Sequence, residues 1–365
     1  MLVGGGYRGE EMQTQNAPPE HVWPSKFAGT AASLCNQTLI DLGGCQDPRF
    51  AGILSPQSHL TANLNASQVY DFDKARLYHQ RHYFPSGIEV LLRRAFTHFQ
   101  INSSVPLALD IGSGSGNSVA AMLRVIDNVQ VVATDVSPDL LAIMTESLRE
   151  EGLPVERVSP MCLDVHEAYF NDGGFDLVCG SAILHHLLDP RRAVTNALHA
   201  LKPGGVAVFF EPFEYGCTIL KLIHSRLLRE SEMRSGGGPD SDPITAEAAE
   251  FLRNVSHHLS IREGISGGVK PITAELDDKW LFTREFFEAI RTDVGASRLI
   301  VYSNHTTNID TMFEDYVRQN FHLGKGWGRE ALPAWAWDTV REVDREVSDE
   351  MKLSFMIEGT IIFVK

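Results

Sequence analysis

Four acidic residues and one pair of adjacent histidines are the side chains of this 365-residue sequence best suited to chemistry. Each acid stands at or just after the end of an apolar run: Asp110, Asp135, Asp164 and Glu211. Carboxylates accept hydrogen bonds from hydroxyl and amino groups and pair with cations. The pair His185-His186 offers a base near neutral pH or a metal ligand.

The two histidines are candidate catalytic residues, and we expect no metal between them. Adjacent side chains on a helix point about 100° apart, so one ion is not readily shared by both. Either histidine could act as a base, or it could serve in cofactor packing or a structural hydrogen bond. Glu211 is the third catalytic candidate, because a carboxylate there could orient a substrate amine or hydroxyl; a structural role is the alternative.

The stretch LALDIGSGSGNSVAAMLRVI, residues 107–126, predicts a strand, a tight glycine turn and a helix. Glycines stand at alternate positions, 112, 114 and 116, directly after the acid at 110. Glycine permits unusual φ values and lets the backbone press against a ligand. The helix start behind the turn offers free N–H groups. A nucleotide-like ligand is therefore expected at this turn.

The spacing of the glycines argues against a dinucleotide. The fingerprint G-x-G-x-x-G would need a third glycine at position 117, which is Asn117. The acid two residues before the first glycine instead favours a ligand with a positively charged amino acid portion. The pattern resembles motif I of the class I S-adenosylmethionine-dependent methyltransferases, and the resemblance extends from about Val105 to Pro212. It implies S-adenosylmethionine as cofactor, bound by Asp110, Gly112, Ser113, Gly114 and Gly116.

Later elements of this block extend the predicted cofactor site. Asp135 ends a second strand 19 residues past Gly116, where an acid reaches ribose hydroxyls in a doubly wound fold. The resemblance implies that Asp164 binds the adenine amino group; solvated loop acids are the alternative. The remaining expected contacts are Val136 and Val165 beside the adenine, and Gly180 and Ser181 beside the methionine portion. The turn L-K-P-G-G before the strand 206–210 is a further family signature.

The segment before the glycine turn is a possible cover. Residues 70–99 look helical and are rich in aromatic and basic side chains. Such segments commonly fold over cofactor and substrate in methyltransferases of this kind, which would make Tyr70, Arg76 and Tyr78 neighbours of the site. The alternative is that these aromatics pack on the sheet.

The expected fold is a doubly wound, Rossmann-like α/β domain with seven strands. The resemblance implies the strand order 3-2-1-4-5-7-6 with the last strand antiparallel. Residues 1–65 are expected to form a disordered or irregular extension, and 66–365 the methyltransferase domain with helical lid insertions at about 213–275 and 305–355. Three of the five tryptophans fall in the second insertion, where they could line a substrate pocket, form a homodimer surface or pack in a core.

Composition limits the possible partners. The formal net charge of −15 and pI of about 5.4 argue against a nucleic-acid binder, which needs a basic face. No apolar run reaches the roughly 18 residues of a membrane span, and we expect a cytoplasmic protein. The five cysteines contain no C-x-x-C pair and are expected to be reduced.

The predicted function is transfer of a methyl group from S-adenosylmethionine to a small organic acceptor. The sulfonium already activates the methyl group, so the protein mainly has to align the acceptor, and alignment can supply roughly 7 to 11 kcal/mol. The motifs do not reveal whether oxygen, nitrogen or carbon is methylated. Two alternatives remain: a nicotinamide-dependent oxidoreductase, and a non-catalytic module that binds S-adenosylmethionine.

Overall fold

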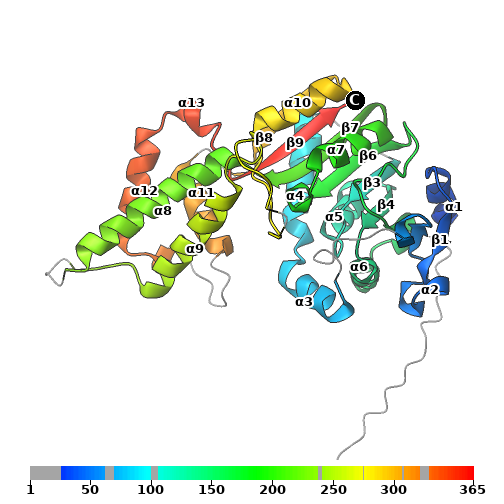
Figure 1. Ribbon diagram of the computed structural model, residues 1–365, viewed down its shortest axis with the longest axis horizontal. Helices are drawn as coiled ribbons and strands as arrows, with labels where there is room; N and C mark the ends of the chain where they lie inside the picture. The colour runs from blue at the N-terminus through cyan, green and yellow to red at the C-terminus, as the bar shows by residue number, and fades with distance from the viewer. Residues whose placement is uncertain are drawn as a thin grey trace, which may run out of the picture.

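The protein consists of a mixed sheet with helices on both faces and a separate group of helices beside it (Figure 1). The computed structural model describes residues 26–61, 70–99, 106–236, 241–273, 275–305, 308–320 and 329–365. The strands are β1 Leu39–Asp41, β2 Leu54–Pro56, β3 Leu107–Ile111, β4 Gln130–Asp135, β5 Val158–Cys162, β6 Phe175–Ser181, β7 Leu201–Pro212, β8 Arg298–Ser303 and β9 Glu358–Val364.

Helices of the sheet region alternate with these strands. They are α1 Lys26–Ser33, α2 Leu42–Cys45, α3 Phe72–His82, α4 Pro85–Phe99, α5 Asn117–Val125, α6 Pro138–Glu150, α7 Pro190–Ala200 and α10 Arg284–Val294. One core cluster packs α4, α5 and α6 on one face, and another packs α1, α7 and α10 on the other. The helices α6, α7 and α10 begin at side-chain caps, since Ser137, Asp189 and Thr283 each accept a backbone N–H of the first turn.

The sheet order confirms the predicted topology and corrects the strand count. The order β5-β4-β3-β6-β7-β9-β8 is the expected 3-2-1-4-5-7-6, with β9 antiparallel to both neighbours. The described sheet has nine strands rather than seven, because β1 and β2 are added beside β5. Leu54 pairs with Met161, and the Ser55 hydroxyl donates to the carbonyl of Cys162.

The two additional strands also correct the expectation for the N-terminal extension. Residues 26–61 contain helices, 3-10 turns and strands, and Phe27, Leu42 and Phe50 are buried in the cores of the sheet region. Each of the two strands has three residues, which is too short for an alternating pattern to appear in the sequence. Residues 1–25 and 62–65 lie outside the described residues.

The single helical segment expected over 70–99 is two helices, α3 and α4. The break falls at Tyr83 and Phe84, directly before Pro85. Proline disfavours the helical conformation of the residue before it, and it suits the first turn of the next helix. As a result α3 lies on α6, where Ala75 packs with Leu140 and Ile143.

The remaining helices form one unit, which we call the helical group. It comprises α8 Glu214–Arg234, α9 Ala246–Arg262, α11 Ile309–Asn320, α12 Ala334–Glu346 and α13 Asp349–Lys352. Leu220 and Leu252, from the first predicted insertion, share a buried cluster with Phe313 and Val340 from the second. The helical group stands apart from the sheet, on the left in Figure 1.

The tryptophans of the second insertion are used in packing. Trp337 is buried in the helical group, and its ring meets Phe313 edge-on at 5.6 Å between centroids. The indole N–H of Trp335 donates to the carbonyl of Asp242. Trp327 lies outside the described residues. No helix among the described residues is both long enough and apolar enough to cross a membrane.

Candidate functional site

The glycine turn lies between β3 and α5, where the sequence places it. Gly112, Gly114 and Gly116 all have positive φ values, of 65°, 52° and 104°. A Cβ on Gly112 would lie 2.3 Å from the Ile183 side chain, and one on Gly116 would lie 2.6 Å from Met144. These two glycines are therefore needed for close packing as well as for backbone conformation.

Gly114 is the glycine of the turn that faces open space. A Cβ there would meet only the Tyr78 ring, at 3.9 Å. Its N–H donates to Oδ2 of Asp135 over 2.8 Å, so the turn and the end of β4 are joined directly. The glycine turn, with free space beside Gly114, has the form expected where a backbone approaches a ligand.

Asp135 is the buried acid at the end of β4. Its Oδ1 accepts the N–H of Ser137 over 2.9 Å, and its Oδ2 accepts Gly114. Burial raises the pKa of Asp135, and the backbone N–H groups of Ser137, Gly114 and Val136 oppose that shift. A carboxylate has about four acceptor positions, so capacity remains for hydroxyl donors. Val136 beside it is half-buried.

Asp110 is fully buried within β3. Its Oδ2 accepts the Ser118 hydroxyl over 2.7 Å, whereas Oδ1 has no hydrogen-bond partner among the described residues. Burial raises the pKa of this carboxyl to about 7, against the opposing effect of Ser118 and of Ser113 in the turn. An unpaired buried carboxylate oxygen is costly, and a cationic donor would satisfy it. The chemistry of this residue therefore fits the ammonium of an amino acid portion.

Asp164 follows β5 and is held by a residue that the sequence analysis did not single out. Its Oδ1 accepts the backbone N–H of His166 over 3.0 Å and the ring Nδ1 over 2.7 Å. Burial alone would raise the pKa of Asp164, but the hydrogen bonds from His166 outweigh it and lower the pKa. The other ring nitrogen of His166 accepts the N–H of Asp189, which caps α7. No spacing rule marks His166, because its partner is two residues away in an irregular turn.

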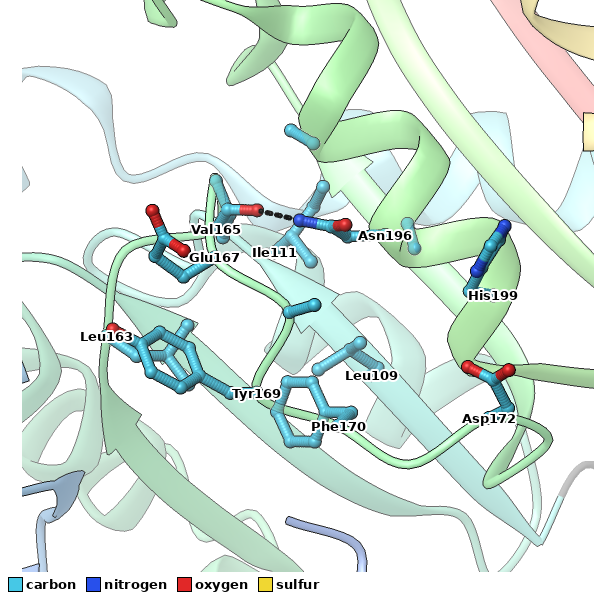
Figure 2. Close-up of a pocket in the computed structure, with 13 residues that line it drawn as sticks. Leu109, Ile111, Leu163, Val165, Glu167, Tyr169, Phe170, Asp172, Asn196 and His199 are labelled. Carbon is cyan, nitrogen blue, oxygen red and sulfur yellow. Dashed lines mark hydrogen bonds between the residues drawn. The ribbon is translucent and has the colours of Figure 1, made fainter. Parts of the chain in front are cut away.

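Val165 lies next to a small cavity on the α7 side of the sheet (Figure 2). Its carbonyl accepts the side-chain amide of Asn196 over 3.3 Å. The cavity has a volume of about 60 Å³ and is lined by Leu109, Tyr169 and Phe170, among others. Pockets for organic ligands have roughly 300 to 1,000 Å³. We interpret this cavity as a packing defect under α7, distinct from the edge where the acids and the glycine turn meet.

Gly180 and Ser181 end β6 beside the glycine turn. A Cβ on Gly180 would lie 2.9 Å from Phe209 and 3.0 Å from Ile111, so the neighbouring strands leave no room for a side chain. Ala182 follows with a φ of 53°, which is uncommon for a residue other than glycine. This sharp turn leads into the 3-10 turn Leu184–His186, which carries the histidine pair.

His185 and Glu211 form a buried pair. Oε2 of Glu211 accepts His185 Nδ1 over 2.6 Å, and Oε1 accepts the backbone N–H groups of Ile183 and Leu184 over 3.0 and 2.7 Å. Glu211 is 2% exposed, so these bonds hold its carboxylate rigidly. With Nδ1 as the donor, the lone pair of His185 is on Nε2, away from Glu211. That nitrogen can accept a proton or bind an ion.

His186 corrects the expectation that the two histidines diverge. They lie in a 3-10 turn instead of an α-helix, and their ring centroids are 4.1 Å apart. Nδ1 of His186 lies 3.1 Å from the carbonyl oxygen of Asp277. Burial lowers the pKa of His186, and the neighbouring His185 adds to that shift.

The loop before α10 brings an acid that the sequence analysis missed. The N–H of Lys279 donates to the carbonyl of His185 over 2.7 Å, which fixes this loop against the histidine turn. Oδ1 of Asp278 then lies 3.6 Å from Nε2 of His185. Burial would raise the pKa of Asp278, but His185, Arg262 and His186 together lower it. The loop follows a long insertion, so no strand-end spacing identifies the residue.

Tyr70 and Tyr78 lie near these acids, whereas Arg76 does not. The two tyrosine rings are 5.4 Å apart. Burial raises the pKa of Tyr78 to about 12, and the charge of Asp135 adds to this shift. The guanidinium of Arg76 is exposed and lies over the Phe72 ring.

Comparison with known proteins identifies the central block. Residues 109–209 match the methyltransferase domain family. The ubiquinone/menaquinone biosynthesis C-methyltransferase of Shewanella halifaxensis is 31% identical over 104 residues, which are 28% of this chain and 41% of that protein. The mitochondrial arginine hydroxylase of Mus musculus is 32% identical over 190 residues, which are 52% of this chain and 50% of that protein.

The chain spans half or less of the length of these two relatives. Among solved structures, phosphoethanolamine N-methyltransferase 2 of Haemonchus contortus has a TM-score of 0.44 and 16% identity, over 81% of this chain and 57% of that one. The matched block begins at β3 and ends within β7, and it includes the glycine turn and the acids that follow β4 and β5. Residues 109–209 are therefore similar to the methyltransferase domain family, in the part of the chain that holds the glycine turn and the strand-end acids.

Proposed function

We propose that the protein transfers a methyl group from S-adenosylmethionine to a small organic acceptor. The observation that carries the proposal is the edge formed by β3, β4 and β6, where an open glycine turn, an unpaired buried carboxylate oxygen and a second buried acid meet. In this proposal the backbone of the turn meets the methionine portion, the unpaired oxygen of Asp110 meets its ammonium, and Asp135 meets the ribose hydroxyls.

The cofactor's place follows from this arrangement. Asp110 pairs with the ammonium, the backbone of Gly112, Ser113, Gly114 and Gly116 lies along the methionine portion and the ribose, and Asp135 accepts the ribose hydroxyls. The adenine then lies between Val136 and Val165, with its amino group toward Asp164. Gly180 and Ser181 lie beside the methionine portion. The bound cofactor supplies an electrophilic methyl group on a sulfonium, and the chain's own residues have to bind, orient and dehydrate the acceptor.

His185 is the proposed catalytic residue. Its Nε2 lone pair is free because Glu211 holds Nδ1. We assign Glu211 as a positioning residue, since its carboxylate accepts hydrogen bonds from His185 and from the backbone of that turn. His186 lies beside His185 and lines the same position. An acceptor with an acidic proton would be activated through Nε2 of His185.

The acceptor is a small molecule in this proposal. The net charge of −15 disfavours RNA, which prefers a basic surface. The paired rings of Tyr70 and Tyr78 would supply part of a cover over the edge. The helical group would select the acceptor, and the sheet edge would hold the cofactor.

Calorimetry with S-adenosylmethionine tests the cofactor assignment. Asp135→Ala should weaken binding by roughly 10- to 100-fold, because hydrogen bonds to a charged acceptor contribute about 1.5 to 3 kcal/mol. Asp127→Ala, which removes an exposed acid after α5, is the matched control and should bind as wild type does. Equal affinities for the two variants would contradict the assignment. NADH added in place of S-adenosylmethionine should give no binding heat.

A transfer assay tests the activity itself. The full chain is incubated with methyl-labelled S-adenosylmethionine and a panel of phenols, amines, keto acids and prenyl-type acceptors, and products are identified by mass. Mass separates an added methyl group from an added oxygen atom, which matters because one relative is named an arginine hydroxylase. Labelled product from a small acceptor is expected. Turnover only of tRNA or folded proteins would overturn the proposed acceptor class.

A further inference from the structure

Three side chains from two separated loops converge beside the sheet edge formed by the ends of β3, β4 and β6, which we call the cofactor edge. Oδ1 of Asp278 lies 3.6 Å from Nε2 of His185 and 3.5 Å from Nδ1 of His186. All three atoms lie within 4.8 Å of one another. Two imidazole nitrogens and one carboxylate oxygen thus surround a single point, although the two histidines are adjacent in sequence.

The spacing suits a metal ion. Ligand atoms bound at about 2.1 Å to a tetrahedral ion are separated by about 3.4 Å. The two distances from Oδ1 of Asp278 are 3.6 and 3.5 Å, close to that separation. Asp278 has 52% of its side chain exposed, which leaves a path for the ion and a coordination position open to another ligand.

Glu211 prepares His185 for coordination. A histidine that binds a metal usually donates its other ring N–H to a carboxylate or carbonyl, which fixes the tautomer and the ring orientation. His185 makes this bond to Glu211 over 2.6 Å, and the backbone of the same turn holds Glu211 in place. The nitrogen that faces Asp278 therefore carries the lone pair.

The charges around the cluster also favour a cation. Glu211, Asp277 and Asp278 face it with three carboxylates. Two cations oppose them: Arg262 Nη1 lies 3.6 Å from Oδ2 of Asp278, and Lys279 Nζ lies 3.2 Å from the carbonyl oxygen of Asp277. Arg262 approaches the oxygen of Asp278 that does not face the histidines, so it orients the carboxylate without occupying the ligand position. At His186, an ion would replace the contact with the Asp277 carbonyl.

We infer that His185, His186 and Asp278 bind a divalent transition-metal ion with at least one open coordination position. Imidazole ligands suit Zn²⁺, Fe²⁺, Co²⁺ and Ni²⁺, whereas Mg²⁺ and Ca²⁺ prefer sites made of oxygen. The site therefore favours Zn²⁺, Fe²⁺, Co²⁺ or Ni²⁺ over Mg²⁺ and Ca²⁺. This inference concerns binding and stands on the cluster alone.

The consequence for catalysis rests on the proposed function. An acceptor hydroxyl at the open position would lose its proton to solvent more easily, because a bound metal lowers the pKa of a coordinated oxygen. The methyl–sulfur bond then breaks as the methyl–oxygen bond forms, giving S-adenosylhomocysteine, a methyl ether and one proton. In this form His185 acts through the ion, since its Nε2 lone pair is coordinated.

Cobalt binding tests the inference without any assay of activity. The metal-stripped full chain is titrated with Co²⁺, whose visible absorption reports nitrogen and oxygen ligands in a low-coordinate site. Wild type should bind one equivalent, Zn²⁺ should displace it, and a large excess of Mg²⁺ should not. His186→Ala should lose the spectrum, and Asp278→Asn should bind at least about tenfold more weakly. His199→Ala, on the surface of α7, is the matched control and should behave as wild type does.

The outcomes separate this inference from the proposed function. The side chain of Asp278 is half exposed, so Asp278→Asn should fold as wild type does. Thermal melting and titration with S-adenosylmethionine check that the variant is intact. No visible spectrum in wild type, or the same affinity in wild type, His186→Ala and Asp278→Asn, would overturn the metal site. Co²⁺ binding without methyl transfer would leave the metal site standing and count against the function. Methyl transfer that is unchanged by chelators would overturn the catalytic role of the ion.

Discussion

The cofactor edge and the helical group are built on different principles. At the edge, particular backbone conformations and strand-end carboxylates recur at fixed spacings, as in Gly114 with a φ of 52° joined to Asp135. In the helical group, two insertions about 30 residues apart in sequence share an ordinary hydrophobic core. The edge is thus encoded by local spacing, whereas the helical group is encoded by packing between segments that are distant in sequence.

Removing a core ring from the helical group should have the largest effect on stability and little effect on the cofactor. Phe313 is fully buried against Trp337 and His224. Phe313→Ala should lower the free energy of unfolding by about 3 to 5 kcal/mol, as measured by denaturant titration. In buffer without denaturant, where the variant is folded, acceptor turnover should fall and the Kd for S-adenosylmethionine should change less than twofold. If the affinity for S-adenosylmethionine fell as much as acceptor turnover, the helical group and the cofactor edge would not have separate roles.

A substitution in the glycine turn changes the cofactor edge and leaves the helical group intact. Gly114→Val places a β-branched side chain at a positive φ in the open position of the turn, and cofactor affinity should fall at least about 100-fold. Gly173→Val is the matched control, because Gly173 has a φ of 73° and nothing within 4 Å of its Cβ position, at the start of β6. Calorimetry should therefore separate two variants with similar backbone strain. Equal cofactor affinities for both would place the cofactor elsewhere.

The junction between the regions is tested by Glu211→Gln. The amide would present a donor toward the N–H groups of His185, so the imidazole would be forced into the other tautomer and Nε2 would lose its lone pair. We expect kcat to fall by about 10- to 100-fold with KM for S-adenosylmethionine unchanged. A loss confined to KM would instead assign Glu211 to the cofactor.

The pH dependence of cofactor binding tests whether Asp110 pairs with the ammonium of S-adenosylmethionine. Its pKa is about 7 in the free protein, so the carboxyl must lose a proton to pair with an ammonium at lower pH. Affinity for S-adenosylmethionine should fall as the pH drops below 7, by up to about tenfold per unit. Asp110→Asn should flatten that profile between pH 5 and 8. A profile that stays steep in the variant would assign the titration to another group.

The smallest expected effect is a loss of stability at acidic pH that arises from His224 in the helical group. Burial lowers the pKa of His224 to about 3, below the value of about 6.5 in an unfolded chain. The unfolded state therefore binds the additional proton as the pH falls below 6.5, and stability decreases by about 1 kcal/mol between pH 6.5 and 5.5. Urea titrations of wild type and His224→Gln at several pH values should show this loss in wild type only. The same acid loss in both would contradict the assignment.

The sequence predicted the fold as far as local signals reach. Strand-end acids, the glycine turn and the L-K-P-G-G turn located β3 to β7. The strands β1 and β2 were missed because three residues carry no periodicity. The convergence of His185 and His186 was missed because a 3-10 turn was treated as an α-helix. Asp278 reaches the site through a long-range contact that no spacing records.

The most direct test of the central claim is a crystal structure of the full chain with S-adenosylhomocysteine. The account predicts the ribose hydroxyls on Asp135, the ammonium beside Asp110 and the sulfur facing the turn that carries His185. The ligand found at another edge of the sheet or within the helical group would contradict it.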